Sequence, residues 1–325
     1  MKNGKSKILN ADLPEEHQSR IQALKNAGGT LMFHSRYLAG EHAGVWNELT
    51  ALGEEVYYDS LAIDALAVAY ETMDRALTNI RLLVTQLHTV GYAFNPMVMA
   101  PYYKNSQMDM GMWAALESMT LEALMDPHHR ELLRQSDVRA TSREAGERQK
   151  LKDEQERHRG VAHPIDNGSQ LPHERIKRIA KAAGEMPISL RTWYKVIGGV
   201  NLTGSHHDIS PFGVKSDPLF VAPLDFVLDA FRAWEEDEWE LGQPFQVPIS
   251  PDSEVKAGGS PTTSMLSITL PAPQMDFIIE AGVQQRTFVE YLRHSFEWAG
   301  FPGYAELPGQ PPEFVRLLKE RMLPI

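Results

Sequence analysis

The stretch Leu190-Arg-Thr-Trp-Tyr-Lys-Val-Ile-Gly-Gly-Val-Asn-Leu-Thr-Gly204 decides the fold of the second half of this chain. Four apolar side chains in it recur at helical spacing and share one face: Leu190, Trp193, Tyr194 and Ile197. Gly198 follows the last of them, where a left-handed helix cap costs little. Gly199 then lets the chain turn into Val200-Asn-Leu202, whose alternation is typical of a strand. The stretch therefore predicts a short helix packed against the edge of a sheet.

The first part of the chain, from about residue 15 to 135, has the periodicity of helices. The longest predicted helix runs from Ser60 to Val90, and its apolar residues recur at threes and fours. These are Leu66, Ala69, Met73, Ala76, Ile80, Leu83 and Leu87. The polar residues between them are expected on the opposite side: Asp74, Arg75, Asn79, Arg81 and Gln86. A methionine-rich stretch, from Met108 to Met125, is interpreted as filler of irregular gaps in the core.

A change of composition predicts a domain boundary. From Ala140 to Gly160 nearly every residue is charged or polar, and Leu151 is the only large apolar one. So little apolar surface cannot offset the entropy of ordering the chain. We therefore expect a helical domain over 1–135, a charged linker or solvated helix over 136–170, and a second domain over 171–325.

The second domain carries strand and helix signals in turn. Pro218 to Ala222 predicts a short apolar strand, and Gln243 to Ile249 predicts an extended segment at a sheet edge. The alternating runs 266–270 and 275–279 predict half-buried antiparallel strands. Thr287 with Glu290 forms a capping-box pattern that opens a helix, and a last amphipathic helix is expected from Glu313 to Met322. The predicted fold class is α+β, with an all-α part followed by a mainly antiparallel sheet flanked by helices.

Residues from about 172 to 305 resemble the SUKH superfamily, the bacterial toxin-immunity and cell-wall-regulator fold. Four segments carry this resemblance: Leu190–Gly204, Asp217-Pro-Leu-Phe-Val-Ala-Pro223, Lys256-Ala-Gly-Gly-Ser260 and Phe288-Val-Glu-Tyr-Leu-Arg293. The resemblance implies a sheet flanked by helices, no catalytic residues, and binding of partner proteins, often toxins, through a variable face. It covers the C-terminal half alone, and the large helical part is a departure from the family pattern.

Composition narrows the classes of function. The chain has 325 residues, 43 acidic against 32 basic, and a net charge of −11. That balance disfavours nucleic acid, whose binding depends on basic residues that displace counterions, and it suits a basic protein partner. No run approaches the roughly 20 apolar residues of a membrane span. The absence of cysteine excludes disulfides and thiolate ligands, and with no secretory signal visible a cytoplasmic location is expected.

The loop Gly204-Ser-His-His-Asp208 is the best candidate for metal chemistry. Imidazole and carboxylate groups could bind a divalent ion, but the adjacent side chains of His206 and His207 diverge on extended backbone. No His-Glu-x-x-His helix, Gly-x-Ser-x-Gly elbow or phosphate-binding glycine loop accompanies it. We therefore predict no catalytic residues, no metal and no cofactor, and assign His206, His207 and Asp208 to contact with a partner.

The sharpest charge run lies near residue 237. Five acids stand beside two tryptophans, and the predicted partner-binding residues are Trp234, Glu235, Glu236, Asp237, Glu238, Trp239 and Glu240. Aromatic anchors in an acidic patch are typical of binding hot spots for a basic protein, although such a run also occurs on ordinary solvated helices.

Three hypotheses of function follow. The first is a non-catalytic protein-interaction module, such as a bacterial immunity or defence-associated protein that neutralises a toxin or effector. The second is a metal-dependent hydrolase that uses His206, His207 and Asp208. The third is a structural adaptor that forms a homodimer through its helical half.

Overall fold

The computed structural model describes residues 15–26, 31–94, 165–166, 172–206, 216–237, 242–256, 265–281, 284–306 and 311–325. The chain divides into two compact units. Unit 1 comprises Met1–Val98 together with Pro164–Ile325, and unit 2 comprises Met99–His163. The methionine-rich stretch and most of the predicted 136–170 linker lie outside the described residues. Everything that follows concerns unit 1.

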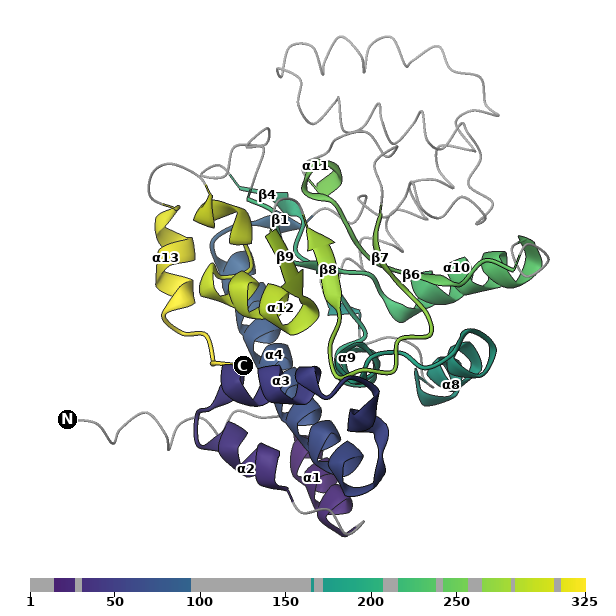
Figure 1. Cartoon of the computed structure of the whole chain (residues 1–325). Coiled ribbons are helices and arrows are strands. Elements are labelled where there is room, and N and C mark those ends of the chain that lie inside the picture. The colour runs from purple at the N-terminus through teal and green to yellow at the C-terminus, as the bar shows by residue number, and fades with distance from the viewer. Residues whose placement is uncertain are drawn as a thin grey trace, which may run out of the picture. The chain divides into compact units, whose positions relative to one another are not determined.

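The first segment of unit 1 is helical, as its periodicity predicts. Its elements are α1 (Glu15–Asn26), α2 (Met32–Leu38), α3 (His42–Ala51), the 3-10 helix η1 (Gly53–Tyr57), α4 (Asp59–Thr89) and the short strand β1 (Ala93–Phe94). Both α1 and α2 pack against α4, the long helix at the centre of the unit (Figure 1). The predicted apolar stripe of α4 is confirmed, since Ala69, Met73, Ile80, Leu83 and Leu87 are all buried.

The second segment mixes short strands with helices. Its first elements are β2 (Ile165–Asp166), α8 (Pro172–Ala183), α9 (Ile188–Val196), β3 (Gly199–Asn201), β4 (Gly204–Ser205), β5 (Phe220–Val221) and α10 (Leu224–Asp237). The remainder are β6 (Gln246–Pro251), α11 (Ser253–Lys256), β7 (Met265–Thr269), β8 (Ile278–Ala281), β9 (Gln284–Thr287), α12 (Phe288–Glu297), the 3-10 helix η5 (Pro302–Ala305) and α13 (Glu313–Lys319). The mixed α and β composition agrees with the predicted class.

Every strand pair in the described part of the chain is antiparallel. The strands form the ladders β1-β4, β2-β3-β5, β6-β7 and β8-β9. A further bond, from the Ala222 N–H to the Ile249 carbonyl at 2.7 Å, connects the residue after β5 to β6. The stretch Leu190–Gly204 folds as predicted: α9 buries Leu190, Trp193 and Tyr194, and Gly198 has a φ of 91°.

The two segments of unit 1 share one hydrophobic core. A single cluster of buried side chains extends from Tyr37 through the apolar face of α4 and the buried face of α9 to Ile325. Helix α9 packs directly against α4 (Figure 1). From the sequence we expected these segments in separate domains. The periodicity of α4 shows that its apolar stripe must be buried, but it does not show that the helices and strands of the second segment cover it.

Part of the polar face of α4 is also buried: Asp74, Arg75 and Asn79 are covered, whereas Arg81 is exposed. The segment after α13 covers part of it. The Asn79 side chain donates from Nδ2 to the Leu323 carbonyl at 2.9 Å and accepts from the Leu323 N–H at Oδ1 at 2.7 Å. Arg75 Nη1 donates to the Pro324 carbonyl at 3.3 Å. Asn79 and Arg75 therefore form hydrogen bonds with main-chain groups that lie 244 or more residues further along the chain.

A buried ion pair fastens the loop before β5 to α11 and α12. The Lys256 Nζ lies 2.7 Å from Asp217 Oδ1 and donates to the Tyr291 hydroxyl at 3.3 Å. The lysine side chain is 2% exposed and the aspartate side chain 26%. Asp217 has a φ of 43°, a left-handed conformation that aspartate and asparagine tolerate better than most residues.

Candidate functional site

Two adjoining pockets form a groove where the N-terminal helices meet the second segment of unit 1, and we call it the α3–β8 groove. The first pocket has a volume of about 320 Å³ and the second about 570 Å³. They share Thr50, Asp276 and Thr287, so they form one continuous depression. Its walls come from α3, η1, the connection between β7 and β8, the start of β8, and α12. Pockets of this size suit ligands or protruding segments, and such sites are common where structural parts meet.

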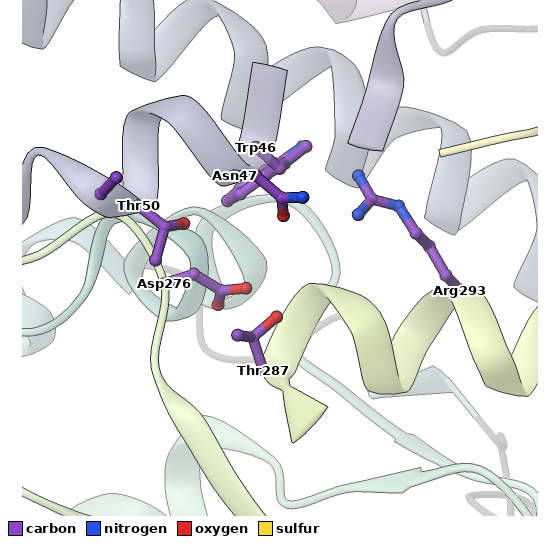
Figure 2. A pocket seen from close by; sticks show the side chains of 7 residues that line it. Trp46, Asn47, Thr50, Asp276, Thr287 and Arg293 are labelled. Atoms are coloured by element: carbon purple, nitrogen blue, oxygen red, sulfur yellow. The ribbon is translucent and has the colours of Figure 1, made fainter. Parts of the chain in front are cut away.

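Helix α3 supplies one wall and is fixed by its tryptophan. Trp46 is buried, and its indole Nε1 donates to the Thr72 hydroxyl of α4 at 3.0 Å. This contact sets the rotation of α3, so that Asn47 and Thr50 line the groove. Figure 2 shows their side chains on one side of the pocket, across from Asp276 and Thr287. The wall is therefore held by core packing.

Asp276 supports the opposite wall as a buried carboxylate. Its Oδ1 accepts the Ser189 hydroxyl at 2.8 Å, and its Oδ2 accepts the Val289 N–H at 3.0 Å. Burial raises the pKa of Asp276, while the hydrogen bonds from Ser189 and Val289 act in the other direction. Because Ser189 lies in the first turn of α9 and Val289 in that of α12, this carboxylate holds two helix N-termini together. Its oxygens are engaged in that structural role.

Thr287 and Arg293 complete the first pocket. Thr287 is the N-cap of α12: its hydroxyl accepts the Glu290 N–H at 3.3 Å and its own N–H donates to Glu290 Oε2 at 2.8 Å. The predicted capping box is thereby confirmed. Arg293 donates from Nε to the Ile325 main-chain oxygen at 2.7 Å and from Nη2 to the His42 carbonyl at 3.2 Å. Burial lowers the pKa of this guanidinium.

The second pocket has a more apolar wall. Pro271, Pro273 and Phe277 line it, together with Ile278, whose side chain is 56% exposed at the start of β8. Ladder β6-β7 and hairpin β8-β9 flank this wall, and Pro271, Pro273 and Phe277 lie in the connection between them. A partly apolar wall opposite the polar side chains of α3 is a surface on which another molecule can rest, with its backbone or side chains bonded along α3.

The structure gives His206 a packing role. Its Nε2 lies 3.0 Å from the Val90 carbonyl, its ring lies 4.9 Å from that of Phe314, and the residue is buried. His207 and Asp208 lie outside the described residues. Within the described ranges, no cluster of three or more side chains with metal-binding groups occurs.

The structure describes only part of the acidic run 234–240. Trp234 is only 8% exposed: its indole donates to the Gln243 carbonyl at 2.8 Å and stacks with Phe231. It belongs to the core, because position 234 falls on the apolar face of α10 and not on its charged face. Glu235 is bonded to Arg178 of α8, and Glu236 is exposed. Asp237 ends α10, and Glu238, Trp239 and Glu240 lie outside the described residues.

Sequence reasoning did not find the α3–β8 groove. Its residues come from positions between 46 and 293, and neither helical nor strand spacing connects them. The one local signal was Asp276, an acidic residue inside the apolar run Met275 to Ile279. That run predicted a strand with Asp276 on its exposed side, whereas the carboxylate is buried between two helix ends.

No family model, curated protein sequence or solved structure matches this chain. The resemblance to the SUKH superfamily therefore rests on its four sequence segments alone. None of the helices in the described residues has the length and apolar character needed to cross a membrane.

Proposed function

We propose that this chain is a protein-interaction module that binds a segment of another protein in the α3–β8 groove. The observation that carries the proposal is the groove itself, which both segments of unit 1 build together. The helical segment, for which the SUKH resemblance offers no role, supplies one complete wall of it. Asp276 and Thr287, which line both pockets, hold helix ends in place, so the site is shaped before a partner arrives.

The walls suit an extended segment or loop of a partner. Ile278 and the two prolines offer an apolar surface on one side, and Asn47 and Thr50 offer polar groups on the other. A net charge of −11 favours encounter with a basic protein through long-range attraction. Together with the SUKH resemblance, these features support a cytoplasmic immunity or defence-associated role in which the partner is a toxin or effector.

Two exposed apolar residues provide a matched test. Ile278 in the groove and Leu317 on α13 are 56% and 55% exposed, so a lysine at either position should leave the fold intact. Proteins that co-purify with the tagged full-length chain from its native host would be identified first. Affinity for that partner should fall at least tenfold in Ile278→Lys, about 1.4 kcal/mol, and remain unchanged in Leu317→Lys. Equal affinity of both variants for the partner would show that the partner does not bind in the α3–β8 groove.

The immunity role has its own readout. Co-expression of the chain should protect cells from the partner's toxicity, and Ile278→Lys should reduce that protection while Leu317→Lys retains it. A partner that binds the groove but is harmless to cells would support the interaction module and contradict the immunity role.

The two other hypotheses remain testable. Elemental analysis of the purified chain tests the metal-dependent hydrolase, because that function requires bound metal; two of its proposed ligands, His207 and Asp208, lie outside the described residues. Light scattering tests the adaptor, because dimerisation through the helical half requires a dimer in solution. In the structure the apolar stripe of α4 is buried by the chain's own second segment, so that stripe is not the dimer face.

A further inference from the structure

Basic side chains gather where α8 packs against α9, although the chain as a whole is strongly acidic. Each helix contributes two at a spacing of four residues, which places each pair on one helical face. The four residues, which we call the α8–α9 basic seam, are His173, Lys177, Arg191 and Lys195. Like charges at this spacing repel one another, so a compact arrangement of them requires an explanation.

Lys195 is the centre of the seam. It is half-buried, and no ion pair or hydrogen bond to its ammonium group occurs among the described residues. Burial lowers its pKa to about 8, and the charges of Arg191 and Lys177 act in the same direction. Only Glu185 opposes them. Burial together with Lys195 and Lys177 also lowers the pKa of His173. The fold therefore holds an under-compensated positive charge here.

Four side-chain donors on α9 lack partners in the described structure; two of them, in Trp193 and Tyr194, belong to its apolar face, and the other two lie on either side of Lys195 around the helix. The Nε of Arg191 and the hydroxyl of Thr192 are both buried and make no hydrogen bond in the described structure. At 100° per residue, Arg191, Thr192 and Lys195 fall within an arc of about 100°, with Lys195 between the other two. Buried polar groups in native proteins almost always have a partner, so two such donors on either side of a half-buried ammonium group indicate a ligand that supplies acceptors.

The carboxylates nearby do not fill this role. Glu174 lies 3.4 Å from Lys177 Nζ and Glu185 lies 3.5 Å from Arg191 Nη1, both at the long end of ion pairing. Their side chains are largely exposed, and such surface pairs contribute little. In the described structure neither pairs with Lys195, and neither accepts from Arg191 Nε or from the Thr192 hydroxyl.

We propose that the α8–α9 basic seam, together with Thr192, binds a phosphoryl group. A phosphate carries up to two negative charges and three or more acceptor oxygens, which matches the unbonded Nε of a guanidinium, an ammonium and an unbonded hydroxyl. A monocarboxylate offers half the charge and two oxygens. The phosphoryl group can belong to free phosphate or to a phosphorylated side chain. This site lies on other helices than the α3–β8 groove and does not depend on the function proposed for that groove.

Lysine NMR on the full-length chain tests the proposal. With ¹³Cε-labelled lysine, the Lys195 resonance is assigned through Lys195→Arg, and exposed Lys181 of α8 serves as the internal control. At constant ionic strength, inorganic phosphate and O-phospho-L-serine replace chloride in separate titrations. A saturable shift at Lys195 is expected, with its pKa rising from about 8 toward 10.5. Thr192→Val should weaken phosphate binding at least threefold.

The comparison between probes and lysines decides the outcome. A response to O-phospho-L-serine at least tenfold stronger than to phosphate identifies a phosphorylated side chain as the source, and equal responses identify free phosphate. Acetate that shifts Lys195 as strongly as phosphate would overturn the choice of ligand. A linear shift, or one that Lys181 shares, would show only general ion binding and would overturn the site.

Discussion

Replacing Asp217 with Asn should destabilise the fold more than replacing its partner Lys256 with Met. The asymmetry comes from burial, because the Lys256 side chain is 2% exposed and that of Asp217 is 26%. In Asp217→Asn a buried ammonium loses its counter-charge and keeps only neutral acceptors, the Tyr291 hydroxyl and the new amide oxygen. In Lys256→Met the remaining carboxylate can be hydrated, and the methionine keeps most of the apolar stem.

The expected magnitudes follow from that difference. Removing one partner of a buried ion pair costs about 3–5 kcal/mol, and the Tyr291 contacts retained in Asp217→Asn place its cost near the lower end, about 3 kcal/mol. For Lys256→Met we expect about 1–2 kcal/mol, because an exposed carboxylate is largely stabilised by water. Asparagine tolerates the left-handed backbone at position 217, so Asp217→Asn adds no conformational strain.

The pH dependence of the pair has a defined sign. Burial alone would lower the pKa of Lys256, but the Asp217 carboxylate and the Tyr291 hydroxyl more than offset it and raise the pKa above its usual value. A lysine whose pKa is raised by folding contributes stability that is complete below the unfolded value of 10.5 and is lost as pH rises above it. In the unmodified chain, the contribution of Lys256 to stability should therefore be constant from pH 7 to 9.

Urea unfolding followed by circular dichroism measures both variants against the unmodified chain. The reasoning fails if Lys256→Met proves the more destabilising variant, or if both cost less than about 0.5 kcal/mol, the range of ordinary surface substitutions.

Three further predictions use the same unfolding assay. Asn79→Ala removes two hydrogen bonds to Leu323 and should lower the free energy of unfolding by about 2 kcal/mol. Exposed Thr85→Ala on the same helix should change it by no more than about 0.5 kcal/mol. Equal costs would show that the Asn79–Leu323 bonds do not stabilise the fold. Burial, with Arg75 and Arg293, lowers the pKa of His42 from 6.5 to about 4, so the unfolded chain binds the proton first and stability should fall by about 1–2 kcal/mol between pH 6.5 and 4. His42→Gln should flatten that part of the profile, and an unchanged slope would assign it to other groups. Gly199→Ala should destabilise the fold by about 1–3 kcal/mol, because the new Cβ would lie 2.7 Å from a main-chain carbon after β5. Gly44→Ala in helix α3 meets open space and should stabilise the fold by about 0.5–1 kcal/mol. A change of stability in the same direction for both variants would refute this account.

Local patterns predicted the elements of this fold well. The i, i+3, i+4 spacing of α9 placed Leu190, Trp193 and Tyr194 in the core, and the Thr287–Glu290 pattern placed the start of α12 at the correct residue. These predictions succeed because helix faces and caps depend on residues within one or two turns of each other.

Packing between distant segments could not be predicted from the same patterns. The sequence did not indicate that Arg75 and Asn79 of α4 are buried, because the main-chain groups that they bind, those of Pro324 and Leu323, lie 244 or more residues away. Trp234 looked like a surface anchor because its acidic neighbours dominate the local composition, although its indole is buried against Phe231. The α3–β8 groove arises from the same long-range packing, which is why no motif marks it.

The bonds between Asn79 and Leu323 have a consequence for synthesis on the ribosome. The middle of α4 emerges early, yet the main-chain groups that satisfy its buried amide are translated 244 residues later. Until then, this stretch of the helix has polar groups open to water and an apolar stripe without its cover, a state that attracts chaperones and proteases. Completion of the fold is thus tied to translation past position 323, and a stalled or frameshifted product that stops short of it would lack the closing contact.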